Sequence, residues 1–331
     1  MSNLVRRAIS VPLLFVLTAL LFATLPIWLP LTLVISLFLP RARSLPRMVG
    51  FVTAYAWCEC LGVLRALWIW LRHGWRRHGA GREAWLAANY ALQNWWCCAL
   101  RTWAVRLFRL RFEIEGADAL EGEAPLMLLR HCSIGDTMIP VVFYASAFGK
   151  RLRFVLKREL LLDPCLDIVG NRLPNYFADR SSTNTAKEVE GIKALARDLP
   201  ASTGVLIYPE GTRFSAAKRA ALLTRLEEKG DTETLARARG WQNVLPPKPA
   251  GALALFESNP RRDLVLCAHT GFEGSADFAR LLNGSWLDTR VRMRFWRVSY
   301  AEIPQSPEDQ RTFLYDLWDR MSLEVADLSE T

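Results

Sequence analysis

The sequence lacks the patterns by which cysteine and histidine build metal sites and disulfide frameworks. It contains seven cysteines and four histidines, but neither residue type recurs at a spacing typical of a zinc site or of paired disulfides. Cys97 and Cys98 are adjacent, and the other cysteines lie in an apolar run or stand alone. An odd number without a pattern favours reduced, structural thiols that face a reducing compartment. We therefore expect no metal site and no bound cofactor.

Charge is lacking over residues 8–39, a run longer than the roughly 20 residues that span a bilayer as a helix. Pro26 and Pro30 remove helix hydrogen bonds, so the run either folds back as a hairpin of two shorter helices or crosses once with a kink. Arginines flank both ends, which places both ends on the cytoplasmic side and favours the hairpin. A cleaved signal peptide is the alternative, although its apolar core is usually only about 7 to 15 residues long.

Positive charge and tryptophan, by contrast, are abundant. The 331 residues carry a formal net charge of +9 and include 13 tryptophans, which suits either nucleic acid or an anionic membrane. Many tryptophans lie near the apolar runs, where their rings favour the membrane interface and neighbouring arginines attract negatively charged headgroups. Membrane phospholipid is therefore the expected partner, and nucleic acid is not.

A second apolar run, residues 48–71, contains Glu59 and Arg65. Charges within an apolar helix suit a segment that lies in or dips into the membrane interface. The residues that follow form either amphipathic helices that seat the rest of the chain on the membrane or ordinary helices with tryptophans in the core. We expect membrane-embedded helices over 1–72, amphipathic interfacial helices over 73–104 and one globular domain over 105–331.

In the globular part, short β-type runs alternate with helical segments, which predicts an α/β sheet flanked by helices. The expected strands are 111–115, 125–130, 151–156, 204–208, 263–268 and 290–299. The expected helices are 136–148, 184–199, 216–239, 249–259 and 307–328. Internal repeats and low-complexity linkers are absent from the sequence.

A histidine and an aspartate five positions apart follow the second expected strand. On one continuous helix the side chains of His131 and Asp136 would point about 140° apart, so they meet only if the chain turns between them. The carboxylate then fixes the ring tautomer, and the other ring nitrogen accepts a proton. Alternatively, Asp136 caps a helix and His131 is a buried structural histidine.

Three further segments follow expected strands, where α/β sheets commonly gather ligand-binding groups. They begin at Lys157, at Asp179 and at Pro209. Two arginines in the later segments, Arg180 and Arg213, can hold a phosphate bidentately. The alternative for each segment is a surface turn with solvated charges.

The third of these segments also contains a flexible turn beside an acid. Gly211 permits close backbone approach, and Thr212 follows it. Glu210 either orients an arginine or accepts a hydrogen bond from the hydroxyl of an acceptor.

Together these segments resemble the sequence blocks of glycerolipid acyltransferases, specifically the lysophosphatidic acid acyltransferases. The His-x4-Asp block is matched by His131 and Asp136, and the Pro-Glu-Gly-Thr-Arg block is complete at residues 209–213. Another block is matched by Lys157, Glu159, Leu160, Pro164 and the triplet Asp179-Arg180-Ser181. A fourth block, an apolar strand with a proline, is weak here.

Two features depart from the family pattern. Arg130 stands where the family usually has Asn, and it either holds the strand end or contacts the lipid headgroup or the donor. A charged helical insertion, residues 216–239, follows the Pro-Glu-Gly-Thr-Arg block. The insertion is similar to that of a longer subgroup that includes lysophospholipid remodelling enzymes.

The resemblance implies a glycerol-3-phosphate acyltransferase-like fold, with a mixed sheet flanked by helices and an N-terminal membrane hairpin. It also implies transfer of a fatty acyl group from acyl-CoA or acyl-carrier protein, as co-substrate, to the sn-2 hydroxyl of 1-acylglycerol 3-phosphate, giving phosphatidic acid. The expected location is a bacterial inner membrane, with the catalytic domain on the cytoplasmic face.

The same resemblance assigns roles to residues. His131 is the base and Asp136 its partner, while the acceptor-binding group consists of Lys157, Arg180, Glu210, Gly211, Thr212 and Arg213. A covalent route through Cys132 or Ser133 is an alternative mechanism. The alternative functions are acylation of another lysophospholipid and a membrane scaffold that binds lipid without turnover.

Overall fold

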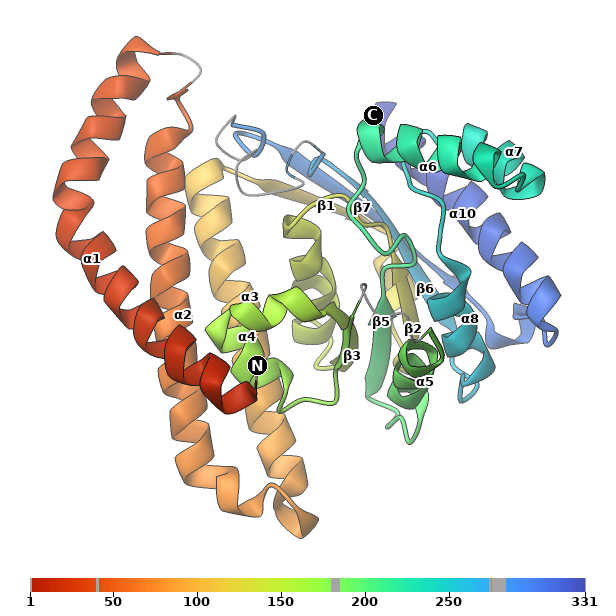
Figure 1. Cartoon of the computed structure of the whole chain (residues 1–331), viewed down its shortest axis with the longest axis horizontal. Helices are drawn as coiled ribbons and strands as arrows, with labels where there is room; N and C mark the ends of the chain where they lie inside the picture. The colour runs from red at the N-terminus through yellow and green to blue at the C-terminus, as the bar shows by residue number, and fades with distance from the viewer. Residues whose placement is uncertain (1, 40–41, 180–184, 274, 276–283, 331) are drawn as a thin grey trace.

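A seven-stranded sheet forms the centre of the computed structural model (Figure 1), which describes residues 2–39, 42–179, 185–273, 275 and 284–330. The strands are β1 (Arg111–Glu115), β2 (Leu126–Leu129), β3 (Arg151–Lys157), β4 (Tyr176–Ala178), β5 (Thr203–Ile207), β6 (Leu264–Thr270) and β7 (Arg290–Val298). Their order is β1-β7-β6-β2-β5-β3-β4. All neighbours are parallel except β6 and β7, so β1 and β7 run opposite to the other five. The mixed sheet implied by the resemblance is confirmed.

The central strands are buried on both faces because helices cover each side. In β2, Met127 and Leu129 pack into one core and Leu126 and Leu128 into the other, as the two-residue period of a strand requires. The first core includes residues of α3 (Arg82–Phe108) and of a π-helical segment (Pro140–Ser146). The second lies under α5 (Thr185–Ala196), α8 (Pro249–Glu257) and α10 (Pro307–Glu330).

The remaining helices are α4 (Pro164–Gly170), α6 (Ala216–Glu228) and α7 (Thr232–Gly240). Short turns of tighter helix cover Gly74–Arg76, Gly79–Gly81, Ala117–Leu120, Gly135–Met138, Arg158–Leu162 and Tyr300–Glu302. The expected single helix over 216–239 is wrong in one respect, because it breaks into α6 and α7 at Gly230, which has a φ of +68°. The helix expected over 136–148 is replaced by the short helix Gly135–Met138 and the π-helical segment.

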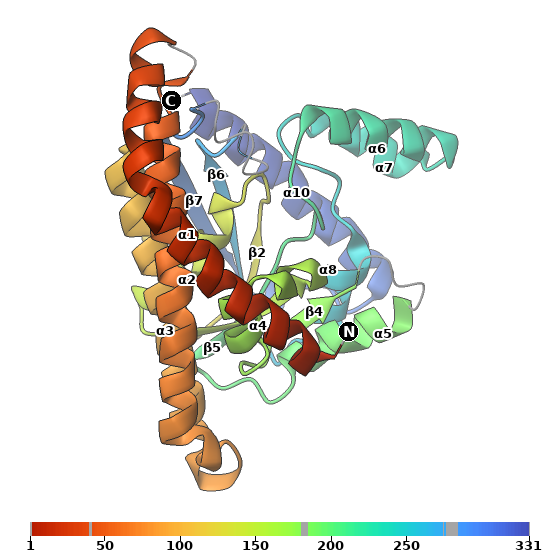
Figure 2. The same ribbon diagram turned by 60° about the vertical axis from the view of Figure 1, so that its left-hand side comes forward.

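The apolar N-terminus forms a hairpin of two long helices, α1 (Asn3–Phe38) and α2 (Leu45–His73), which pack along each other in opposite directions (Figures 1 and 2). Both are long and apolar enough to cross a membrane. The expected hairpin is therefore confirmed, but the fold-back within residues 8–39 is wrong. α1 continues through Pro12, Pro26 and Pro30 as one helix, so the arginines that flank it lie at opposite ends.

Buried polar contacts attach this hairpin to the rest of the chain. Asp167 of α4 is fully buried and forms ion pairs with Arg6 at 2.6 Å and Arg7 at 3.0 Å. Glu59, the acid within the second apolar run, accepts hydrogen bonds from the Trp96 indole at 2.6 Å and the Cys165 backbone N–H at 3.1 Å. Glu59, one of the two charges that suggested an interfacial helix, thus binds α2 to α3 and α4.

The insertion is anchored to the last helix by one tryptophan. The Trp241 ring is 1% exposed, and its indole N–H donates to Asp319 of α10 at 2.6 Å. Four residues later, the backbone N–H of Leu245 donates to Glu210. Packing of the insertion on α10 therefore positions the Pro-Glu-Gly-Thr-Arg turn.

We expect Trp241→Ala to lower the free energy of unfolding by about 3 to 5 kcal/mol, the usual cost of a large-to-small change in a core. Trp241→Phe should cost about 1 kcal/mol, because the ring volume is largely kept and mainly one hydrogen bond is lost. Thermal unfolding of the full chain in detergent measures both. Equal midpoints for Trp241→Ala and the wild type would contradict this anchoring role.

Candidate active site

The two most specific sequence blocks meet at one edge of the sheet. β2 and β5 are parallel neighbours, so their carboxyl ends lie side by side. His131 follows β2 by two residues, and Pro209 and Glu210 follow β5 by two and three. Two hydrogen bonds join the segments: the His131 N–H donates to Glu210 Oε1 at 2.8 Å, and the Phe214 N–H donates to the His131 carbonyl at 2.7 Å.

His131 and Asp136 are in contact. The His131 Nδ1 lies 3.0 Å from Oδ1 of Asp136 and 3.2 Å from Oδ2. The chain turns between them, as the sequence argument requires. Asp136 is not a helix N-cap, because its Oδ2 accepts the backbone N–H groups of Cys132 at 2.6 Å and Ser133 at 2.8 Å, both of which precede it. The carboxylate closes the turn that contains its own histidine.

These contacts settle the protonation of the pair. Burial acts to raise the pKa of Asp136, but the adjacent His131 and His269 rings and the Ser133 N–H outweigh it and hold that pKa below its ordinary value. Asp136 is thus a carboxylate at neutral pH and can only accept. Nδ1 must then carry the proton, which leaves the lone pair on Nε2 of His131.

The His131 ring is held from a second side. Its centroid lies 4.4 Å from that of Tyr208, with 31° between the planes. The Tyr208 hydroxyl donates to the Asp136 carbonyl at 3.3 Å. The His131 side chain is 12% exposed, whereas that of Asp136 is fully buried. The imidazole edge is therefore open to a substrate while its partner is shielded from water.

Glu210 holds the backbone of the site through two hydrogen bonds. Both of its carboxyl oxygens accept backbone N–H groups, Oε1 from His131 and Oε2 from Leu245 at 3.0 Å. Burial raises the pKa of Glu210 to about 8, against the opposing effects of these N–H donors and of Arg130. The carboxyl is 1% exposed, so its contacts are those of a positioning residue. The contacts that the Glu210 carboxyl makes here are therefore with the backbone of His131 and of Leu245.

The turn after Glu210 presents a cation. Gly211 has a φ of +66°, and a Cβ there would lie 3.0 Å from Cδ of Lys248, so glycine is required. The Thr212 hydroxyl accepts a hydrogen bond from Lys218 Nζ at 3.1 Å. Arg213 is half-buried and, within the described residues, no carboxylate pairs with its guanidinium. An anion is the natural partner for such a group.

The two other expected acceptor-binding residues differ in outcome. Lys157 ends β3, next to β5 in the sheet, and pairs with Glu159 at 2.9 Å. No contact joins it to His131 in the part of the chain that the structure describes. Arg180 lies outside the described residues.

Arg130 is a buried connector and does not reach the surface. It is 1% exposed, and its guanidinium donates to the carbonyls of Asn243 and His269 and to the carboxylate of Glu273. Its face lies 5.7 Å from the Phe214 ring. Of the two roles left open by the sequence, the structure places Arg130 in the first, because it ties the end of β2 to the segments after α7 and β6.

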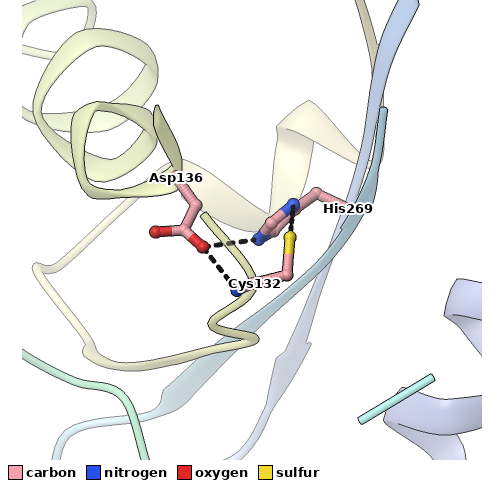
Figure 3. A group of neighbouring side chains, drawn as sticks. All are labelled: Cys132, Asp136 and His269. Atoms are coloured by element: carbon pink, nitrogen blue, oxygen red, sulfur yellow. Dashed lines mark hydrogen bonds and ion pairs between the residues drawn. The ribbon is translucent and has the colours of Figure 1, made fainter. Parts of the chain in front are cut away.

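Sequence reasoning missed His269, at the end of β6, which stands beside Asp136 (Figure 3). Its Nε2 lies 3.8 Å from Oδ2 of Asp136 and 3.1 Å from the Arg130 carbonyl oxygen. Its Nδ1 lies 4.0 Å from Sγ of Cys132. Its place at the carboxyl end of an expected strand was the available signal, but nothing showed that this strand neighbours β2.

Ligand atoms of Cys132, Asp136 and His269 lie within 4.8 Å of one another, a grouping that can in principle hold a metal ion. However, Asp136 Oδ2 already accepts two N–H donors, and burial raises the pKa of the Cys132 thiol well above its ordinary value. Burial also lowers the pKa of His269. The Asp136 oxygen that already accepts two N–H groups and the buried Cys132 thiol suit a hydrogen-bonded cluster better than a cation site.

Comparisons with known proteins agree with this site. Residues 111–251 match the family model described as Acyltransferase. The fold is similar to the crystal structure of the 1-acyl-sn-glycerophosphate (LPA) acyltransferase PlsC from Thermotoga maritima, with a TM-score of 0.52, 14% sequence identity, and coverage of 85% of this chain and 98% of that chain. Comparison with curated proteins finds no match.

The family match covers both halves of the site, from the strand before His131 to the turn at Arg213 and on to Lys248. The solved structure adds a likeness of fold over most of the chain. With the His-x4-Asp and Pro-Glu-Gly-Thr-Arg blocks in contact across two parallel strands, residues 111–251 form a domain that matches the Acyltransferase family model.

Proposed function

We propose that the protein transfers a fatty acyl group from a thioester donor to the sn-2 hydroxyl of 1-acylglycerol 3-phosphate, giving phosphatidic acid. The observation that carries the proposal is the oriented His131–Asp136 pair beside a turn whose arginine, Arg213, has no carboxylate partner among the described residues. The donor is acyl-CoA or acyl-carrier protein, bound as a co-substrate. The structurally similar protein from Thermotoga maritima is described as an acyltransferase for the same lysophospholipid.

In the proposed reaction, Nε2 of His131 accepts the hydroxyl proton as the acceptor oxygen attacks the thioester carbonyl carbon. The C–S bond then breaks, and the imidazolium returns the proton to the departing thiolate. Asp136 stabilises the imidazolium through the 3.0 Å contact at Nδ1. Because Asp136 is buried and ionised, the charge it contributes acts in a low-dielectric surrounding, where it is worth more than in water.

Arg213, Gly211 and Thr212 would hold the acceptor phosphate, with Arg180 and Lys157 as further candidates. Correct orientation of an acceptor against its base can supply up to about 7 to 11 kcal/mol of a barrier. Here the same β5 turn carries the arginine and, through Glu210, fixes the backbone of the base. The phosphate and the proton acceptor are thereby placed on one rigid unit.

The covalent route is disfavoured by the surroundings of both candidate nucleophiles. The Ser133 hydroxyl is fully buried, lies 2.7 Å from the Ser275 hydroxyl and accepts the Gly135 N–H at 2.9 Å. Cys132 is 2% exposed, and burial raises its thiol pKa, which removes the thiolate that nucleophilic catalysis requires.

The two long apolar helices suit a membrane enzyme whose catalytic domain meets lipid at the bilayer surface. A bacterial inner membrane with the catalytic domain on the cytoplasmic face is the location we propose. The free, reduced cysteines fit that compartment.

His131→Ala should lower kcat by about 10²- to 10⁴-fold, the usual contribution of a general base. Asp136→Asn should cause a comparable loss, because an amide NH₂ cannot accept the N–H groups of Cys132 and Ser133 and bind Nδ1–H as well. Mass-spectrometric transfer assays with both donors measure the product, and His73→Ala serves as the matched histidine control. Unchanged transfer by folded His131→Ala protein would refute the mechanism and favour a non-catalytic lipid scaffold.

Arg213→Gln should raise the KM for lysophosphatidate by about 10- to 100-fold, the worth of one charge-assisted hydrogen bond to phosphate. Arg213→Lys should fall between, since it keeps the charge but loses the planar fork. Arg225→Gln, an exposed arginine on α6, is the control. Transfer to lysophosphatidylglycerol with none to lysophosphatidate would instead assign the protein to remodelling.

A further inference from the structure

A second cavity lies away from His131, at the base of the helical hairpin. It has a volume of about 800 Å³ and is enclosed by the start of α1, the last turns of α2, the start of α3 and the end of α4. No residue of the His131 site lines it. Its size falls in the range of about 300 to 1,000 Å³ that is typical of small-ligand sites.

One wall of this cavity is basic and short of negative charge. Arg7, Arg77, Arg82 and Arg172 line it. Asp167, beside it, is already shared between Arg6 and Arg7. Arg7 thus has a carboxylate partner, whereas among the residues that the structure describes no ion pair is formed by Arg77, Arg82 or Arg172.

Arg172 shows the consequence most clearly. It donates to the carbonyl oxygen of Ala66 at 2.8 Å and lies 4.9 Å from the Trp85 ring, and neither partner carries a charge. Burial, with Arg7 as the next cause, lowers the pKa of Arg172 to about 10. A half-buried cation held by uncharged partners gains most from an added anion, because the local dielectric constant is low.

The other basic residues lie at the mouth of the cavity. Arg77 and Arg82 are exposed, and no carboxylate in the described part of the chain forms an ion pair with either. Asn3 and Asn171 add amide groups to the lining. These groups can donate to the oxygens of a phosphate, and Arg77 and Arg82 can do so without breaking an existing ion pair.

Apolar side chains of α1, α2, α3 and α4 also line the cavity. They are Val11, Val63, Leu67, Leu86 and Ile168. Trp70 also lines the cavity and is 48% exposed, and nearby Trp75 is 73% exposed. Exposed tryptophans at the end of a long apolar helix mark the level of the lipid headgroups. An anion that enters here arrives with acyl chains attached.

We propose that this cavity binds one anionic membrane phospholipid, distinct from the acceptor and donor, with its phosphate on Arg172 and Arg82 and an acyl chain along Val63 and Leu67. Such a lipid supplies the negative charge that Asp167 alone does not provide. It also contacts both the hairpin helices α1 and α2 and the helices α3 and α4, which pack against that hairpin.

The test is lipid retention by the full-length protein, measured by native mass spectrometry after extraction from nanodiscs of phosphatidylglycerol or of phosphatidylcholine. We expect one retained phosphatidylglycerol per chain and no retained phosphatidylcholine. The double variant Arg82→Gln/Arg172→Gln should weaken phosphatidylglycerol binding by about tenfold or more, the usual loss for removed charge-assisted contacts. Arg225→Gln/Arg311→Gln removes two exposed arginines elsewhere and should retain the lipid.

Two results would overturn the proposal. Equal retention by the double variant and the control would show that the lipid is held by general membrane charge. Retention of lysophosphatidate that is lost in the double variant, with a matching rise in its KM for acyl transfer, would make the cavity part of the substrate site. Lipid retention is measured without donor or acceptor, so its outcome is separate from that of the His131 variants.

Discussion

The active site depends on one buried carboxylate. Asp136 lies in a four-residue turn whose backbone N–H groups point inward, and it accepts from two of them while binding the imidazole of His131. These contacts offset the cost of burying a charge. They also fix which ring nitrogen of His131 carries the proton, so that the shape of the turn and the basicity of the histidine are set together. Removal of the carboxylate would release both.

The residues around Asp136 differ in how deeply they are buried. Glu210 and Arg130 are almost fully buried and bind backbone groups of three segments. They join the end of β2 to the β5 turn and to the chain after α7. His131 and Arg213, by contrast, are partly exposed. Ionisable side chains in this region therefore divide into buried ones that hold the backbone and partly exposed ones, and burial distinguishes them.

Buried ion pairs and hydrogen bonds join the helical hairpin to the rest of the chain. Arg6 and Arg7 at the start of α1 meet Asp167, and Glu59 of α2 meets α3 and α4. Such contacts fix the orientation of the hairpin against the sheet edge that carries the site. The basic cavity forms where these elements meet.

The sequence alone determined the class of sheet, most strand positions and the two blocks of the site, because strand period and turn chemistry are local properties. It also placed His131 near Asp136, since five residues and a turn bring them together. Tertiary structure decided the rest. The continuous helix through three prolines, the burial of Arg130 and the approach of His269 to Asp136 all depend on segments more than a hundred residues apart or on packing between helices. The sequence shows which chemical groups are present. Only the fold determines which of them are buried together and which are in contact.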